Sequence, residues 1–455
     1  MFFDFRHMLT FPVLAWISSL LNHTFNDSRS CKTIPLDATW PSKVHWNNFN
    51  EFLGGRLIRT IPIAQSCHTP KYDEAHAWIT DFDSPSYQGV AVKAQAGVTA
   101  EILYEHADSR GYAVFAQIQA RALAWPEDIS KAGDIPCLAP CMALRQTSLS
   151  FEVITTSGEF LIASPTQNRD LYWALSGGGG GTYGIVWSVT IKFHKDLPIT
   201  IATVEFLSEN LSSDTFCEGI NAFHASTLSY TAAGGFGFSA YTTKFFRLKP
   251  LAFPNITSTA VAEIVQPLLS SLELLGISYI HSLTTYPGFL NAVRHITESA
   301  DYGVGLQHFG GRLLPGSLWK DLKSFSRMTS VIREIIEDGG TAFDVAMRPS
   351  LQAERLLIPM LPWDDYASWD EILQTRNKVT WTFDEPLRRL APDSGAYLNE
   401  ADTSEPDWKT ALYGKNYARL LAIKDRYDPA QLLYGSTAVG GDRWIETEHG
   451  RLCPA

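Results

Sequence analysis

The most informative part of the sequence is Asp170-Leu-Tyr-Trp-Ala-Leu-Ser-Gly-Gly-Gly-Gly-Gly-Thr-Tyr-Gly-Ile-Val-Trp187. Its five consecutive glycines, Gly177–Gly181, carry no Cβ, so the backbone can adopt left-handed angles and a ligand can approach the main-chain N–H groups. The pattern predicts a short helix from Arg169 to Leu175 before the glycines and a strand from Ile185 to His194 after them. Such a run can form a loop in contact with a ligand, but taken alone its composition favours a flexible loop.

Two common phosphate-binding motifs do not fit this stretch. A P-loop requires Gly-Lys-Ser/Thr after its glycines, whereas Gly181 is followed by Thr182-Tyr183. A Rossmann fingerprint follows a strand and opens a helix, whereas this run follows a helix and opens a strand. The glycine run therefore belongs to another kind of site.

The elements around this run predict an α+β fold. Before it, a strand at 88–97, a helix from Thr99 to Arg110 with Thr99 as its N-cap, and a hairpin of 150–155 with 159–163 are expected. After Pro198, strands alternate irregularly with helices, which differs from strict βαβ alternation. The expected elements there are strands at 200–207 and 235–243 and helices at 258–275, 316–338 and 408–427. Pro198 is the predicted domain boundary.

Length and charge limit the classes of protein that are compatible with the chain. Its 455 residues exceed what one hydrophobic core normally serves, which predicts two domains. The chain is 45% hydrophobic and 19% charged, as is usual for a globular protein. A net charge of −11 disfavours nucleic acid and anionic membrane surfaces, since both attract Lys and Arg. No nucleic-acid partner and no stable membrane association are expected.

The N-terminus and the cysteines indicate export. The apolar run from Met8 to Leu21 is too short for a comfortable membrane span and suits a signal peptide over 1–21, although a buried N-terminal helix is the alternative. Glycosylation sequons occur at Asn22, Asn26, Asn210 and Asn255. Six cysteines permit disulfides without giving their pairing. Because Cys137 and Cys141 lack a nearby His or a second Cys pair, no metal site is expected. The predicted location is extracellular or the endomembrane lumen.

The region 168–194 resembles the late part of the FAD-binding domain in vanillyl-alcohol-oxidase-type (PCMH-type) flavoproteins, specifically the berberine-bridge-enzyme-like family. The family pattern there is Asp-Leu-Phe/Tyr-Trp-Ala-Leu, a glycine run, Phe/Tyr-Gly-Ile/Val-Val and a strand. The resemblance implies FAD as the cofactor. It implies that Gly184, Ile185 and Val186 line the adenine half, with Gly178, Gly179, Gly180 and Gly181 close to the cofactor.

The C-terminal part resembles the same family. Gly395-Ala-Tyr-Leu-Asn-Glu-Ala-Asp402 is similar to a Tyr-x-Asn-Glu strand beside the isoalloxazine, and 413–429 is similar to the closing helix. The resemblance implies that Asn416 and Tyr417 lie near the flavin, and that Tyr413 or Tyr397 is the active-site base. Packing on a helix or strand face is the alternative for these tyrosines.

The N-terminal segment from Cys31 to His68 also resembles fungal members and suggests a Cys31–Cys67 disulfide. The implied organisation is a truncated FAD-binding domain at 31–197, then an antiparallel-sheet substrate-binding domain with helices at 198–395. A segment at 396–453 then returns to the FAD-binding domain.

Two family features are missing, so the FAD-binding domain is expected to be incomplete. Relatives carry a Gly-His-x-Tyr-x-Gly-Arg-Ser loop, whose His often bonds covalently to the flavin, but here Ala77–Thr80 leads directly into 81–92. No His in this sequence follows a Gly, so FAD, if bound, is expected to be non-covalent. A Cys-Pro-Thr-Val-Gly-x-x-Gly-Gly run, present in relatives, is absent from 117–146.

The resemblance implies an FAD-linked oxidoreductase that transfers a hydride from a small molecule, expected to be a secondary metabolite, to the flavin, with O₂ as acceptor. The missing loops leave two alternatives open. One is a non-redox or catalytically degenerate descendant that binds a metabolite or a partner protein without flavin. The other is that the sequence omits coding material. Hydrolase chemistry is disfavoured, since Gly-x-Ser-x-Gly and His-Glu-x-x-His motifs are absent.

Overall fold

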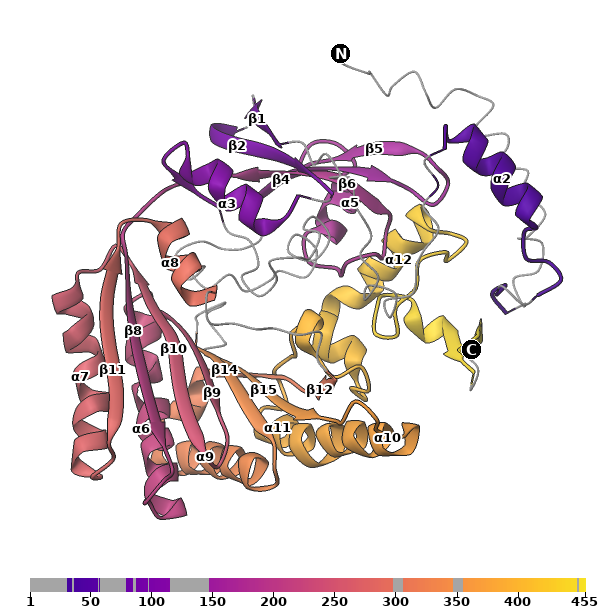
Figure 1. Ribbon diagram of the computed structural model, residues 1–455. Coiled ribbons are helices and arrows are strands. Elements are labelled where there is room, and N and C mark those ends of the chain that lie inside the picture. Colours follow the sequence, from indigo (N-terminus) through magenta and orange to yellow (C-terminus); the bar gives the residue numbers. More distant parts are fainter. Residues whose placement is uncertain are drawn as a thin grey trace. The chain divides into compact units, whose positions relative to one another are not determined.

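The computed structural model describes residues 31–34, 37–55, 57, 79–84, 87–96, 98–114, 147–297, 306–346, 355–447 and 450–455. The chain divides into two compact units, Met1–His76 with Gly440–Ala455 and Ala77–Val439 (Figure 1). Several predictions lie outside the described residues. They are the signal peptide at 1–21, Asn22, Asn26, Cys67, Cys137, Cys141 and the region 117–146.

The smaller unit joins segments from the two ends of the chain. Helix α2 (Lys43–Phe52) begins at Ser42, whose hydroxyl accepts a hydrogen bond from the His45 backbone N–H. Strand β16 (Trp444–Glu446) pairs antiparallel with β17 (Leu452–Pro454).

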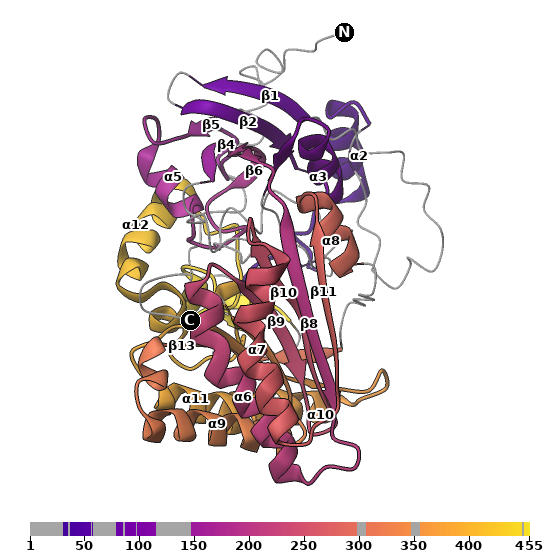
Figure 2. The same cartoon turned by 90° about the vertical axis from the view of Figure 1, so that its left-hand side faces the viewer.

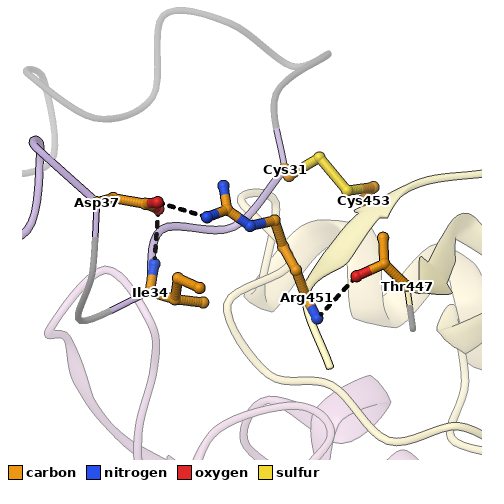
Figure 3. The surroundings of a disulfide bond; sticks show 6 residues. All are labelled: Cys31, Ile34, Asp37, Thr447, Arg451 and Cys453. Carbon is orange, nitrogen blue, oxygen red and sulfur yellow. Dashed lines mark hydrogen bonds and ion pairs between the residues drawn. A yellow bond between two sulfur atoms is a disulfide. The ribbon is translucent and has the colours of Figure 1, made fainter. Parts of the chain in front are cut away.

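A disulfide links Cys31 to Cys453 in this unit (Figure 3). The Lys32 backbone N–H donates to the Leu452 carbonyl oxygen at 2.7 Å, which brings the two cysteines side by side. The predicted Cys31–Cys67 pairing is therefore wrong, because the Cys31 sulfur is already bonded. The error arose because a backbone contact across the whole length of the sequence has no local signal.

The first sheet of the larger unit is antiparallel, with the order β1-β2-β6-β4-β5. Its strands are β1 (Ile79–Ser84), β2 (Tyr87–Gln95), β4 (Ser148–Ile154), β5 (Phe160–Ala163) and β6 (Ile185–Lys192). Helices α3 (Ala100–Asp108) and α5 (Arg169–Leu175) contribute Leu103 and Leu171 to its core. The short strands β3 (Tyr112–Ala113) and β7 (His194–Lys195) pair separately.

The second sheet has the order β11-β8-β10-β9-β14-β15-β12, and β13 also pairs with β15. Its strands are β8 (Ile199–Leu207), β9 (Phe236–Tyr241), β10 (Phe245–Pro254), β11 (Tyr279–Tyr286), β12 (Gln307–Phe309), β13 (Arg312–Leu314), β14 (Thr341–Ala346) and β15 (Arg355–Pro362). Figure 2 shows α6 (Ser213–Ala232) and α7 (Ser258–Leu274) over this sheet, and their apolar side chains share one core with it. Pro198 lies between β7 and β8, directly before the first strand of the second sheet.

The remaining helices of the larger unit pack into the core of the second sheet or into the core of the first. Helices α9 (Leu322–Glu337) and α11 (Asp384–Leu390) pack into the second core, whereas α8 (Phe289–Thr297) contributes Phe289 to the first. Helix α10 (Trp369–Lys378) begins with a Ser368–Glu371 capping box. Helix α12 (Tyr417–Tyr427) returns to the first core through Leu420 and Ile423.

The predicted α+β class is confirmed, but three local predictions are wrong. The helix predicted at 316–338 is interrupted, because a 3₁₀ turn (Gly316–Trp319) precedes α9 and the backbone is extended at Asp321. The segment 395–402 is not a strand, because its only regular structure is a 3₁₀ turn at Leu398–Glu400. The helix predicted at 408–427 is broken. A π-helical turn (Lys409–Tyr413) and a 3₁₀ turn (Gly414–Asn416) precede α12, since Gly414 adopts a φ of +54°.

Two further findings concern the predictions about export and membranes. Asn210 and Asn255 are exposed, and their glycosylation stays a prediction. Among the helices that the structure describes, none combines the length and the apolar character needed to cross a membrane.

Candidate active site

The two family-like regions of the sequence lie against each other. Asp170 on α5 accepts hydrogen bonds from Arg426 at 2.8 Å and from the Tyr427 hydroxyl at 3.0 Å, both on α12. The Arg419 guanidinium lies 3.8 Å from the centre of the Trp173 ring, within the range of a cation–π contact. The glycine run that follows α5 is thereby held beside the C-terminal segment.

A cavity of about 370 Å³ opens between the glycine run and the C-terminal segment, within the larger unit. Its walls come from the glycine run, the 398–400 turn, Tyr413 and the loop after α12. The lining residues are Gly179, Gly180, Gly181, Thr182, Leu398, Asn399, Tyr413, Gly435, Ser436, Thr437 and Ala438.

Steric constraints explain the glycine at position 178, where the helix ends. The Gly178 N–H donates to the Ala174 carbonyl oxygen at 2.8 Å. A Cβ on Gly178 would lie 2.5 Å from that oxygen and 2.6 Å from the Tyr183 hydroxyl, too close for any side chain. The next residue, Gly179, has a φ of +97°, which other residues rarely adopt. The glycines therefore fix the path of the loop as well as opening it to a ligand.

Both loops of the cavity offer backbone donors. Within the described ranges, the backbone N–H groups of Gly179–Gly181 and of Gly435–Thr437 donate no hydrogen bond to another protein group. Buried or ligand-facing N–H groups are usually paired, and successive unpaired ones favour anionic oxygens. A bare backbone with donors on two walls therefore fits a phosphate-bearing cofactor such as FAD.

Tyr413 lies in the cavity wall, but its hydroxyl is already engaged. The side chain is 6% exposed, and its hydroxyl donates to the Thr437 carbonyl oxygen at 2.9 Å. Burial, and then the neighbouring Tyr417, raise the pKa of Tyr413 well above its ordinary value. The hydrogen bond to Thr437 favours a role of Tyr413 in holding the 435–438 loop, and its role as the active-site base stays a prediction.

Tyr397, the other predicted base, is not among the residues that line this cavity. Its hydroxyl accepts a hydrogen bond from the Asn399 side-chain amide at 3.0 Å, and its ring packs against the cluster of Phe236, Leu356 and Ile358. The structure thus brings Tyr413 and Asn399 to the cavity, and the Tyr397 hydroxyl holds the Asn399 amide. The role of Tyr397 as the active-site base stays a prediction.

Several residues that the family resemblance assigns to the cofactor lie outside the lining. A Cβ on Gly184 would lie 2.6 Å from Val153 Cγ1, so this glycine is required by strand packing. Val186 is fully buried in the core, whereas Ile185 is 55% exposed.

The two residues assigned to the flavin at the start of α12 also lie outside the lining. Tyr417 packs 5.8 Å from Tyr413 between ring centres, and Asn416 precedes the first turn of α12. The cofactor contacts of Gly178, Gly184, Ile185, Val186, Asn416 and Tyr417 stay predictions.

Sequence reasoning missed the second wall of the cavity. Gly435–Ala438 follows the closing helix, where a short Gly-Ser-Thr stretch carries little local signal. The only available indication was its position directly after Tyr427-Asp428-Pro429. Thr182, Leu398 and Asn399 lie within the two family-like motifs, but the resemblance assigns none of them to a site.

A second polar cluster adjoins the 398–400 turn. His308 Nε2 lies 2.7 Å from Asp402 Oδ1, and the other Asp402 oxygen accepts from the Thr380 hydroxyl. Burial, and then the charge of Asp402, raise the pKa of Asp384 to about 8, and burial raises the pKa of Glu400 to about 7. These carboxyl groups can hold a proton near neutral pH.

Comparisons with known proteins give the family of the chain. The family model described as "Berberine and berberine like" matches residues 396–439, which include Tyr413 and the 435–438 wall. The chain is 29% identical to the FAD-linked oxidoreductase patO of Aspergillus clavatus, over 95% of this chain and 96% of that protein. It is 32% identical to the bifunctional decalin synthase calF of Penicillium decumbens, over 82% of this chain and 68% of that protein.

A solved structure shares the fold. The VAO-type flavoprotein MtVAO615 from Myceliophthora thermophila superposes with a TM-score of 0.84 at 24% identity, over 94% of this chain and 100% of that one. The alignment with the Aspergillus relative extends over 553 positions, more than the 455 residues of this chain, so that relative contains segments that this chain lacks. The chain belongs to the berberine-bridge-enzyme-like family of FAD-linked oxidoreductases, with a vanillyl-alcohol-oxidase-type fold.

Proposed function

We propose that this FAD-dependent enzyme holds its FAD non-covalently in the cavity and oxidises a small secondary metabolite, with O₂ as the electron acceptor. The observation that supports this most directly is that two loops, Gly179–Thr182 and Gly435–Ala438, line one cavity. Among the described residues, the backbone N–H groups of Gly179–Gly181 and Gly435–Thr437 have no protein acceptor. FAD, when bound, supplies the chemistry that no side chain provides, namely uptake of a hydride and its transfer to an acceptor.

The protein's own residues bind and orient. Backbone N–H groups of the two loops suit anionic oxygens, and the protonated Tyr413 fixes the Thr437 carbonyl. Asn399, held by Tyr397, presents a polar side chain to the cavity next to Leu398. Leu398 and Asn399 together give one part of the cavity an apolar and an uncharged polar group, which suits a small neutral substrate beside the cofactor. The name of the Penicillium relative refers to decalin, a small bicyclic skeleton, and supports the same substrate class.

The sequence supports the non-covalent part of this proposal. No His in the chain follows a Gly, so the usual attachment residue has no counterpart in the sequence. We also propose a location outside the cytosol, which the Cys31–Cys453 disulfide supports because such bonds persist in oxidising compartments. Recovery of the protein from the culture medium of a fungal host checks this location.

The test compares cofactor retention by two variants. The purified protein, incubated with FAD and desalted, is expected to keep the flavin absorption band, and acid precipitation of the protein is expected to release the flavin into the supernatant. Gly180 is exposed in the cavity wall and is absent from the positive-φ glycines, so Gly180→Leu adds bulk there with little backbone strain. This variant is expected to lose the band. Gln167→Leu, at an exposed position outside the cavity, is the control and is expected to keep it.

The outcomes separate the possibilities. A wild-type protein that stays colourless contradicts the proposal, and flavin that precipitates with the protein contradicts the non-covalent part of it. Equal retention by Gly180→Leu and Gln167→Leu would place the cofactor elsewhere.

A second candidate is acid–base chemistry on a metabolite without flavin. The observation that favours it is the presence of two carboxyl groups, Asp384 and Glu400, whose pKa values are raised to about 8 and about 7, close to the His308–Asp402 hydrogen bond. Turnover of a metabolite by FAD-free protein, unchanged by added FAD, would select this candidate. Turnover that requires FAD would exclude it.

A further inference from the structure

Lys424 is a buried lysine whose ammonium group contacts the first loop of the cavity and the residues that lead into the second. It lies on α12 and is 2% exposed. Its Nζ donates to the Thr182 carbonyl oxygen at 2.8 Å, at the end of the glycine run. It also donates to the Leu433 carbonyl oxygen at 2.8 Å, just before the second loop begins at Gly435.

Asp428 completes this arrangement from one helical turn further along. It is fully buried, and its Oδ2 accepts a hydrogen bond from Lys424 Nζ. The same carboxylate accepts from the backbone N–H groups of Leu432 at 2.8 Å and Leu433 at 3.1 Å. Asp428 therefore holds the start of the second loop directly, and Lys424 links that loop to the glycine run.

The chemistry of a buried ammonium explains why this contact is rigid. A lysine ammonium has three N–H donors, and here two carbonyl oxygens and one carboxylate receive them. A buried charge is tolerated only when it is paired and hydrogen-bonded, so the two loops cannot separate without leaving Lys424 or Asp428 unsatisfied. The cost of separating them keeps the cavity walls in place before any ligand binds.

We propose that Lys424 and Asp428 form a clamp that preorganises the cofactor cavity, with Lys424 as a positioning residue that does not touch the cofactor. Neither residue lines the cavity, and both act through the backbone of the two loops that do. The expected ligand effect rests on the proposed function, since it assumes that FAD binds in this cavity. Removal of the clamp is expected to weaken FAD binding because the loops must then be ordered at the moment of binding.

The test compares Lys424→Met and Asp428→Asn with a control that disrupts a different buried ion pair. Arg355 and Asp344 are both fully buried and ion-paired between β14 and β15, and neither lines the cavity. Arg355→Met therefore removes a buried cation at comparable structural cost but away from the two loops. Asp344→Asn is the milder control if Arg355→Met does not fold.

Two measurements are made on each protein: FAD affinity by quenching of FAD fluorescence, and hydrogen exchange of the FAD-free protein. Lys424→Met is expected to raise the Kd for FAD about tenfold or more. It is also expected to speed exchange in both 177–183 and 432–438. The Arg355→Met control is expected to lower the Tm while leaving the Kd within about twofold and the exchange of both loops unchanged.

The outcomes keep the clamp and the proposed function distinct. A Lys424→Met protein that loses Tm but binds FAD within about twofold of wild type overturns the clamp. Faster exchange in only one of the two loops also overturns it. If the wild-type protein itself does not bind FAD, the proposed function fails, and the exchange measurement still decides whether the clamp exists.

Discussion

The buried Asp384 carboxyl group is expected to make the stability of the protein depend on pH. It is 2% exposed on α11, and burial, followed by the charge of Asp402, raises its pKa from 3.8 to about 8. Between these values the folded protein keeps a proton that the unfolded chain has released. The unfolded state then binds fewer protons, so the free energy of unfolding falls as the pH rises from about 4 to about 8.

The substitution Asp384→Asn is expected to remove this dependence, because the amide resembles the protonated carboxyl group and carries no charge at any pH. Its Tm is expected to exceed that of the wild type at pH above about 8 and to differ little near pH 4. Asp365→Asn, at an exposed position, serves as the control. Its difference in Tm from the wild type is expected to stay the same across the pH range. Thermal unfolding across the pH range measures this, and parallel curves for Asp384→Asn and wild type would contradict it.

Local patterns predicted elements well where buried apolar residues recur at helical spacing. Helix α5 was predicted at Arg169–Leu175 and lies there, since Leu171, Ala174 and Leu175 are buried at helical spacing. Helix α6 was not predicted, because its hydroxyl-rich sequence has a weak local pattern, and Phe216, Ile220 and Phe223 place it by packing into the second core. The Gly435–Ala438 wall was missed for a similar reason, since it forms only where distant segments meet.

The turn from α5 into the glycine run gives a prediction at the scale of an element. Gly178→Ala is expected to destabilise the protein by about 1–3 kcal/mol, because the added Cβ meets the Ala174 carbonyl oxygen and the Tyr183 hydroxyl. Gly180→Ala, in the same loop but exposed, is expected to change stability by less than about 1 kcal/mol. Denaturant unfolding measures both. Equal losses for the two variants would contradict the packing described for Gly178.

At the scale of the whole molecule, the family could be inferred from sequence because two distant motifs occur in the expected order. The structure shows that these two motifs lie against each other. Asp170 in the first motif accepts from Arg426 and Tyr427 in the second. The disulfide partner of Cys31 could not be inferred in this way, since Cys453 lies 422 residues away and no local pattern favours it over Cys67.

The pairing of these cysteines is a direct prediction for the whole chain. Peptide mapping without reduction is expected to join the peptide containing Cys31 to the one containing Cys453, since the Lys32–Leu452 hydrogen bond aligns them. Cys217 is buried without a disulfide partner and is expected to react with thiol reagents only after unfolding. A Cys31–Cys67 peptide would contradict the C-terminal β16–β17 arrangement.

The central claim is that two loops from distant parts of the chain hold FAD between them. A crystal structure of the protein reconstituted with FAD tests it most directly. We expect density for the cofactor against Gly179–Thr182 and Gly435–Ala438, with no covalent bond to a side chain. Ordered loops that face an empty cavity at saturating FAD, or a cofactor bound elsewhere, would contradict the claim.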